Sequence, residues 1–361
     1  MRPWLVLDSA GVLVVLVASS ILTRFFRSLA PRMGFVDKPA TRKLHRSPVP
    51  LLGGAAVFTS LALFGVVLLA GLKLGWLAAS SSVALKRMVE ASADIRFILV
   101  SAGATVCLMV GLVDDRCGLT PVFRLVIQTA LAVTVVTLGL KPEYEFLPHP
   151  YLEVAAVLWL VGIMNAFNLI DGADGLAAGI ALIACATLGF IMLLGKQPVA
   201  SLLVAALAGA VAGFLIHNLH PARIFLGSSG SLLVGFLLGA AALTASDAGH
   251  IESPRLGRLV VPVLTVMVPV YDTLSVICIR LFTRSPILRA DRNHIHHRLM
   301  RKGYSHRATV FVLWSVSALI CGGSVVITLA LPGQWIRVAA LCVVVAAPLT
   351  MAELLPRRVY D

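Results

Sequence analysis

The sequence predicts an all-α fold, a polytopic membrane helix bundle of about eleven transmembrane helices. Of the 361 residues, 59% are hydrophobic and only 13% are charged, whereas soluble domains carry roughly 25% charged residues. The apolar runs are close to the ~20 residues with which a helix crosses the hydrocarbon core. They lack the alternation of period two that a membrane β-barrel needs, and a helix satisfies its own backbone in lipid.

The apolar runs divide the chain into eleven predicted spans within one integral membrane domain, residues 1–361. The first run leads into a basic loop without the small-residue pattern of a signal-peptide cleavage site, so we interpret it as a retained helix. The fifth span is the least regular, because its last turn runs into a polar motif. The predicted spans cover residues 5–26, 51–72, 95–113, 122–140, 151–169, 176–194, 199–217, 228–246, 258–281, 309–331 and 336–352.

Lysine and arginine gather in alternate loops and so predict the orientation of the bundle. The positive-inside rule assigns the rich loops to the cytoplasm, which places the N-terminus outside and the C-terminus in the cytoplasm. The rich segments contain Arg24, Arg27, Arg32, Lys38, Arg42, Lys43 and Arg46 after the first span, Arg284, Arg289, Arg292, Arg298, Arg301, Lys302 and Arg307 after the ninth, and Arg357 and Arg358 in the tail.

The formal net charge of +13 fits this bias together with contact between basic loops and anionic lipid headgroups. The sharper alternative is that some of these cations hold phosphate groups. Because the charge is spread over loops between spans, we expect membrane lipids as partners and no nucleic acid.

Two adjacent carboxylates, Asp114 and Asp115, follow a wholly apolar span. Carboxylates are costly at membrane depth, so they are functional candidates by default. Neighbouring carboxylates repel unless a cation lies close by, and Mg²⁺ takes carboxylate oxygen together with water and substrate phosphate. The alternative is a solvated helix end with Arg116 as a neighbour.

A second cluster places Asn165, Asn168, Asp171 and Asp174 three residues apart. In a helix this spacing puts successive side chains near one face. The glycines that follow each aspartate predict that the helix ends there, with both aspartates on a turn. A polar turn in which Asp174 caps the next span would explain one aspartate but not the whole series.

Two more polar clusters fall on the same predicted side of the membrane, which favours one composite site. Residues 227–231 read Gly-Ser-Ser-Gly-Ser just before a span. Backbone N–H groups at such a helix start bind anions, although ordinary capping explains the pattern equally well. His294, His296 and His297 lie in a loop rich in arginine. Their spacing is not that of a standard metal site, so they predict a loop that handles phosphate and protons, with a basic lipid-binding loop as the alternative.

In combination these motifs resemble the polyprenyl-phosphate N-acetylhexosamine-1-phosphate transferases, glycosyltransferase family 4. The histidine loop is similar to that of the branch that starts O-antigen, teichoic-acid and related polymers. It differs from the loop of the relative phospho-MurNAc-pentapeptide translocase. The resemblance covers nearly the whole chain, and its matching segments are residues 37–39, 42–45, 48–54, 111–115, 165–176, 218–222 and 291–299.

The resemblance implies a reaction on the cytoplasmic side of a bacterial inner membrane. A UDP-N-acetyl sugar, UDP-GlcNAc first among the candidates, would give its sugar-1-phosphate to undecaprenyl phosphate and release UMP, which starts a cell-envelope polysaccharide. Several negative charges meet in this transfer, so Mg²⁺, or alternatively Mn²⁺, and protein cations would have to screen them. The sequence leaves open which sugar is used, which polymer follows and whether the protein forms a homodimer.

By resemblance, the carboxylates and histidines take catalytic and metal-binding roles. The implied catalytic residues are Asp114, Asp115, Asp171, Asp174 and His294. The implied metal ligands are Asp115, Asn168, Asp171 and Ser228, at the position of an expected aspartate. The implied substrate contacts are Lys43, His45, Asn165, Asn218, Arg292, His296, His297 and Arg298. A further acid within a span, Asp272, is expected to face the interior and pair with a loop arginine.

Position 228 departs from the family pattern. The family has Phe-Leu-Gly-Asp-x-Gly-Ser where residues 225–231 of this chain read Phe-Leu-Gly-Ser-Ser-Gly-Ser. A serine hydroxyl is a weak, neutral ligand for Mg²⁺, so the alternative to an active transferase is an impaired member that binds lipid phosphate or nucleotide sugar. A secondary transporter is a further alternative, but the sequence shows no inverted repeat of interrupted helices.

Overall fold

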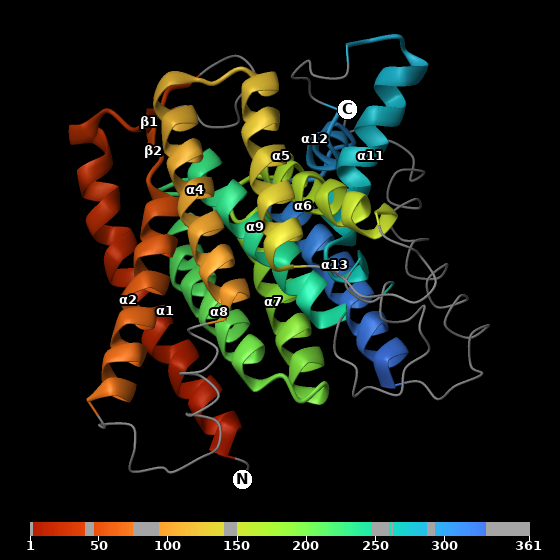
Figure 1. Cartoon of the computed structure of the whole chain (residues 1–361). Helices are drawn as coiled ribbons and strands as arrows, with labels where there is room; N and C mark the ends of the chain where they lie inside the picture. The colour runs from red at the N-terminus through yellow and green to blue at the C-terminus, as the bar shows by residue number, and fades with distance from the viewer. Residues whose placement is uncertain are drawn as a thin grey trace.

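The computed structural model describes residues 3–39, 47–74, 94–140, 150–246, 260, 263–286 and 293–329. Within these ranges the protein is a bundle of helices (Figure 1), of which nine are long and apolar enough to cross a membrane. The nine are α1 (Pro3–Met33), α2 (Gly53–Lys73), α4 (Ile95–Cys117), α5 (Pro121–Leu138), α6 (Tyr151–Ile170), α7 (Leu176–Leu194), α8 (Pro198–Asn218), α9 (Gly227–Ser246) and α13 (His306–Leu329).

The all-α membrane bundle predicted from the sequence is confirmed. The irregular fifth span is a continuous helix, α6. The C-terminal part of the ninth span corresponds to α11 (Met267–Phe282), which has 16 residues; part of its N-terminal portion lies outside the described residues. The eleventh span lies outside the described residues, so the count of eleven and the positions of the termini stay predictions.

Two helices extend further than their apolar runs predict. α1 continues to Met33, and α4 continues to Cys117. Both are followed by a glycine in the left-handed conformation, Gly34 (φ 74°) and Gly118 (φ 70°), which glycine adopts without steric cost. Hydropathy marks where side chains become polar, whereas a helix ends where the backbone turns. The adjacent aspartates therefore belong to the last turns of α4.

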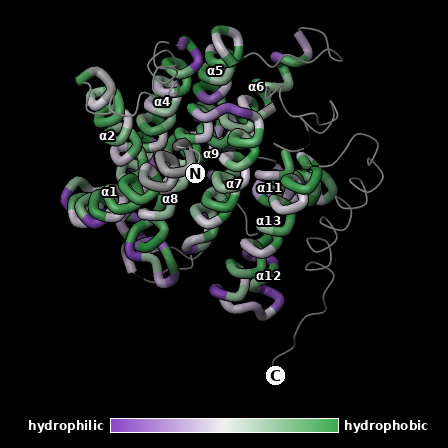
Figure 2. Tube along the Cα trace, turned by 90° about the horizontal axis from the view of Figure 1, so that it is seen from below, coloured by the Kyte–Doolittle hydropathy of each residue, from purple (hydrophilic) through white to green (hydrophobic). Residues whose placement is uncertain are grey.

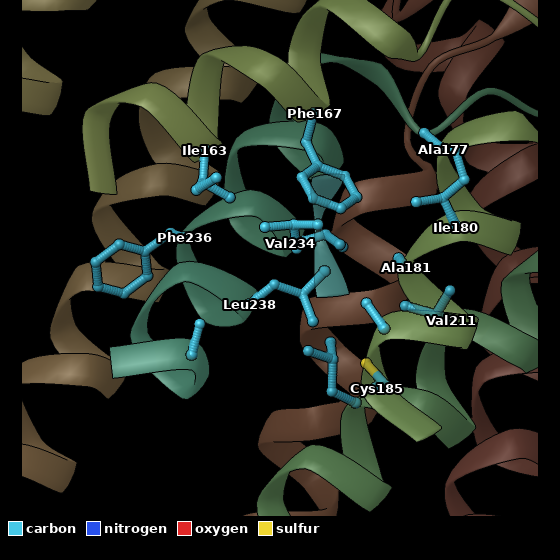
Figure 3. Packing of buried hydrophobic residues seen from close by; sticks show 14 of the residues in the cluster. Ile163, Phe167, Ala177, Ile180, Ala181, Cys185, Val211, Val234, Phe236 and Leu238 are labelled. Atoms are coloured by element: carbon cyan, nitrogen blue, oxygen red, sulfur yellow. The ribbon is translucent and has the colours of Figure 1, made fainter. Parts of the chain in front are cut away.

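α9 lies in the middle of the bundle and packs against α4, α6 and α7 (Figure 1). Its side chains Val234, Phe236 and Leu238 are fully buried. In Figure 3 they share one apolar cluster with Ile163 and Phe167 of α6 and with residues of α7 and α8. Seen from below, the helices are apolar over most of their length, and polar residues gather in short stretches (Figure 2). The start of α9 is thus fixed by a large buried interface.

A short antiparallel ribbon fastens the segment that leads into α9. β1 (Val36–Asp37) pairs with β2 (Val49–Pro50). The Phe225 N–H donates to the Pro50 carbonyl at 2.8 Å, so the ribbon is hydrogen-bonded to the residues just before the helix.

Two glycines let neighbouring helices approach the first turn of α9 closely. A Cβ at Gly111 of α4 would overlap the backbone of Ser229, and a Cβ at Gly54 of α2 would overlap the backbone of Gly230. Any larger side chain at either position would push α9 away, so these glycines set the distance at which the polar helix ends meet.

We expect Gly111→Ala to destabilise the protein by about 1–3 kcal/mol, as other overpacked sites do, although alanine favours helix by ~1 kcal/mol. The measurement is thermal unfolding in detergent. The matched control is Gly162→Ala in α6, where an added Cβ meets nothing within 4 Å, and its Tm should stay level or rise. Equal Tm values for the two variants would show that the α4–α9 contact is not tight.

Candidate active site

Asp115 caps the N-terminus of α9 from a different helix. Its Oδ1 accepts the Ser228 N–H at 2.7 Å and its Oδ2 accepts the Ser229 N–H at 3.1 Å. The first N–H groups of a helix lack partners within the helix and favour an anion. These N–H groups therefore bind a carboxylate of the protein itself, and binding of a ligand anion by the Gly-Ser segment stays a prediction.

Asp114 points to a different set of partners. Its Oδ1 accepts the Leu119 N–H at 2.8 Å, and its Oδ2 lies 2.6 Å from Nη1 of Arg124 in α5. The carboxylate is 7% exposed, so this ion pair fixes the turn between α4 and α5. The two adjacent acids thus separate, one toward α5 and one toward α9, and a catalytic role for Asp114 stays a prediction.

The turn between α6 and α7 carries the Asn/Asp series. α6 ends at Ile170, and α7 begins after Gly175 (φ 76°), so both aspartates lie on a turn, as the glycines predict. Asn168 Oδ1 accepts the Ser231 hydroxyl at 2.9 Å, which ties α6 to α9. Asn165 lies one turn earlier and donates to Gln128 Oε1 of α5 at 2.6 Å. Its amide already holds two helices together, and its substrate contact stays a prediction.

Asp171 lies in the field of two other carboxylates. Its removal from solvent raises the pKa of Asp171 well above the ordinary value, and the negative charges of Asp115 and then Asp174 raise it further. The Gly227 N–H acts in the opposite direction. A carboxyl group placed among acids is stabilised as an anion by a cation, so this point between α4, α6 and α9 favours a cationic ligand.

Asp174 does not cap α7, because Gly175 is the N-cap and makes no side-chain cap bond. Its Oδ2 lies 2.7 Å from His220 Nδ1 and accepts the Ala222 N–H at 3.1 Å. The rings of His220 and His306 stack at 4.2 Å. The ligand atoms of these three side chains lie within 4.8 Å of one another, so Asp174 is part of a carboxylate–histidine group.

Asn218 hydrogen-bonds to the turn that carries Asp174. Its side chain is buried, accepts the Gly175 N–H at 2.9 Å and donates to the Ile224 carbonyl at 2.9 Å. These bonds join the α6–α7 turn to the segment before α9. A substrate contact for Asn218 stays a prediction.

The histidine loop is anchored by an acid inside α11. Asp272 is fully buried; its Oδ2 lies 2.8 Å from His294 Nδ1, and its Oδ1 accepts the Ile295 N–H at 2.6 Å. It thereby holds the start of α12 (Ile295–Arg301). We expected Asp272 to pair with a loop arginine, but these contacts assign it to the histidine loop. Arg298 Nη2 donates to Ser275 Oγ of α11 at 2.8 Å.

His296 is 1% exposed, and neither ring nitrogen has a hydrogen-bond partner among the residues that the structure describes. Its Nε2 lies 2.6 Å from the position that a Cβ on Gly172 would occupy, so the ring faces the turn that carries Asp171. Burial lowers the pKa of His296 well below the ordinary value, and the neighbouring His297, His294 and His306 add to the effect. Buried polar groups are hydrogen-bonded as a rule, so these two nitrogens fit a ligand or an ordered water. His297 packs beside it, with ring centroids 4.2 Å apart.

The part of the chain that carries most of these polar residues also matches a known protein family. The sequence profile of glycosyl transferase family 4 matches residues 97–246. The chain is 34% identical to the probable undecaprenyl-phosphate N-acetylglucosaminyl 1-phosphate transferase of Bacillus subtilis, over 85% of this chain and 83% of that protein. The chain belongs to glycosyl transferase family 4. This confirms the family that the motifs predicted.

Two other members of the family are similar over most of their length. The decaprenyl-phosphate N-acetylglucosaminephosphotransferase of Mycolicibacterium smegmatis is 34% identical, over 96% of this chain and 88% of that protein. The undecaprenyl-phosphate alpha-N-acetylglucosaminyl 1-phosphate transferase of Escherichia coli K12 is 25% identical, over 86% of this chain and 82% of that protein. The similarity therefore extends well beyond the region of the profile.

The carboxylates of this family 4 chain fit a hard divalent cation. Asp115 and Asp171 interact electrostatically, and Mg²⁺ prefers carboxylate and amide oxygens with several waters. Asn168 lies beside Ser231 of α9, within the same group of helix ends. Ser228 lies against Asp115 and brings a neutral hydroxyl in place of an acid. The donor set fits Mg²⁺ with one acid fewer than the family pattern predicts.

Some expected residues lie outside the described part of the chain: Lys43, His45 and Arg292. Other residues of the site were missed. Arg124 gave no local signal, because its partner Asp114 lies on another helix. His220 lies in the matching segment 218–222, but its pairing with Asp174 could not be read from the sequence. His306 begins α13 and was not among the predicted site residues.

We expect Asp114 and Arg124 to be coupled in stability. In a double-mutant cycle with Asp114→Asn and Arg124→Gln, the coupling energy should be about 0.5–3 kcal/mol, because removing either partner leaves the other without its ion pair. The readout is chemical unfolding in detergent. The matched control pairs Asp114→Asn with Arg32→Gln, whose effects should add. A cycle for Arg124 that is also additive would contradict the anchoring role.

Proposed function

We propose that this chain transfers N-acetylglucosamine-1-phosphate from UDP-GlcNAc to undecaprenyl phosphate and releases UMP, with Mg²⁺ as the metal. The observation that carries the proposal is the meeting of Asp115 and Asp171 at the start of α9. Relatives in the family bear the names of polyprenyl-phosphate transferases of this sugar phosphate. The product would start a cell-envelope polysaccharide, and the site would face the cytoplasm of a bacterial inner membrane.

The proposed transfer brings two phosphate-bearing substrates together. An oxygen of the lipid phosphate attacks the sugar-bearing phosphorus of the donor, the bond from that phosphorus to the bridging oxygen breaks, and UMP leaves. Bound Mg²⁺ supplies charge screening and polarises phosphoryl oxygen. Asp115 and Asp171, with Asn168, would hold it.

The remaining side chains bind and orient the substrates in this proposal. His296 is buried, and no residue in the described ranges hydrogen-bonds to its ring, so a phosphate oxygen or hydroxyl fits its ring nitrogens. Asp272 fixes His294, and preorganised groups of this kind lose little freedom when charge develops. Asp174, held by His220, would contact the nucleotide sugar, and His297 and Arg298 would contact phosphate.

UMP release by the purified chain with undecaprenyl phosphate, Mg²⁺ and a panel of UDP-N-acetyl sugars tests the proposal. We expect turnover with UDP-GlcNAc and a loss of about 100-fold or more in Asp171→Asn, because a charged group among the reacting phosphates is removed. Asp94→Asn is the matched control. Asp94 caps α4 by accepting the Arg96 N–H, and asparagine caps equally well. Absence of turnover with every sugar would leave the binding-only alternative, which the names of the relatives do not favour.

The serine at position 228 generates a separate prediction. Ser228→Asp adds a carboxylate next to Asp115, so we expect a lower half-saturating Mg²⁺ concentration for UMP release. Ser229→Asp is unsuitable as a control because Ser229 is fully buried, so Ser228→Asn, which adds a neutral side chain, serves instead. Identical Mg²⁺ titrations for the parent and Ser228→Asp would exclude this position from the metal site.

A further inference from the structure

A basic cavity of about 800 Å³ opens between α1, β2 and the segment that joins α8 to α9. Its lining includes Arg24, Arg27 and Arg223, together with His217. None of Asp115, Asp171, Asp174 or His296 lines it. The cavity is therefore distinct from the candidate active site, although both lie at polar ends of the bundle.

The walls of the cavity are held by specific contacts. His217 is 4% exposed, and its Nε2 lies 3.0 Å from Ser20 Oγ of α1. The His217 carbonyl accepts the Arg223 N–H at 3.0 Å, which fixes the backbone that carries this arginine. Ser19 Oγ of α1 also donates to the Ala210 carbonyl of α8 at 2.6 Å. α1 and α8, which both contribute to the lining, are thus hydrogen-bonded to each other.

The positive charge of the cavity is not balanced by the protein around it. Arg24 and Arg27 are three residues apart on α1, a spacing at which like charges destabilise a helix. Within the described part of the chain, the cavity lining contains no carboxylate and none of the three arginines forms an ion pair.

A carboxylate does approach this loop from the other side. Asp174 accepts the Ala222 N–H, and Ala222 lines the cavity. That carboxylate is 15% exposed and already pairs with His220. It therefore does not neutralise the three arginines. An external anion remains the group that the cavity lacks, and arginine binds phosphate with paired N–H donors.

Apolar side chains beside the arginines indicate what else the ligand carries. Ile21 and Phe25 of α1 are 62% and 56% exposed, and Ile216 and Leu219 beside His217 are 55% and 48% exposed. Exposed apolar side chains next to cations are typical of the boundary between headgroups and acyl chains. We propose that this cavity binds the phosphate headgroup of an anionic phospholipid whose acyl chains lie along α1 and α8.

Native mass spectrometry of the full chain, released from nanodiscs of phosphatidylcholine with added phosphatidylglycerol, tests the proposal. We expect the parent to retain phosphatidylglycerol. Arg24→Gln/Arg27→Gln/Arg223→Gln should weaken retention roughly a hundredfold, if each arginine contributes as one basic residue does at an anionic surface. The corresponding triple lysine variant keeps the charge but loses the paired donors, so it should retain more phosphatidylglycerol than the glutamine variant and less than the parent, which distinguishes lost charge from a folding defect.

The matched control is Arg32→Gln/Arg284→Gln/Arg301→Gln, which removes the same charge from exposed arginines that do not line the cavity. Its retention should equal that of the parent. Equal losses in the two glutamine variants would mean diffuse attraction and would overturn the proposal. Competition arms identify the ligand source: displacement by inorganic phosphate alone, or by undecaprenyl phosphate in preference to phosphatidylglycerol, would overturn the assignment to a phospholipid.

Discussion

The carboxylate of Asp115 at the N-terminus of α9 is the interaction on which the site depends. Two backbone N–H groups of α9 bind it, and the glycines at 54 and 111 allow α2 and α4 to come close enough for this contact. The same group also brings negative charge beside Asp171. One residue therefore closes a helix end and creates the electrostatic demand for a cation. Ser228 supplies one of those N–H groups and adds no third charge.

At the polar end of the molecule, the acidic groups and the arginines lie in two separate clusters. Carboxylates and histidines meet where α4, α6, α9, α12 and α13 converge, whereas three arginines meet between α1 and the α8–α9 segment. The short stretch from His217 to Ser228 runs between the two groups and has side chains in both. Asn218 and Ala222 hold it toward Asp174, and His217 holds it toward α1. A single segment, held by these hydrogen bonds, thus separates the carboxylate–histidine group from the arginine-lined cavity.

The sequence predicted the membrane helices well because lipid imposes a simple rule: an apolar run of sufficient length becomes a helix. It also predicted the turn at Asp171 and Asp174, since glycine marks a place where a helix can end. It was less accurate at the ends of α1 and α4, where the backbone continues past the last apolar residue to a left-handed glycine. Asp272 was recognised as an interior acid, but its partner could not be read from spacing, because His294 lies 22 residues away.

The sequence by itself determined the fold class, the family and most of the polar residues that gather at the helix ends, because composition, apolar length and local motifs are properties of neighbouring residues. Only the tertiary structure decided which partner each polar group has. Asp114 and Asp115 are adjacent, yet one binds Arg124 and the other caps α9. Asp174 meets His220 and His306 from two further segments. Such pairings depend on the distances between packed helices. Those distances are set jointly by the side-chain volumes of the whole core.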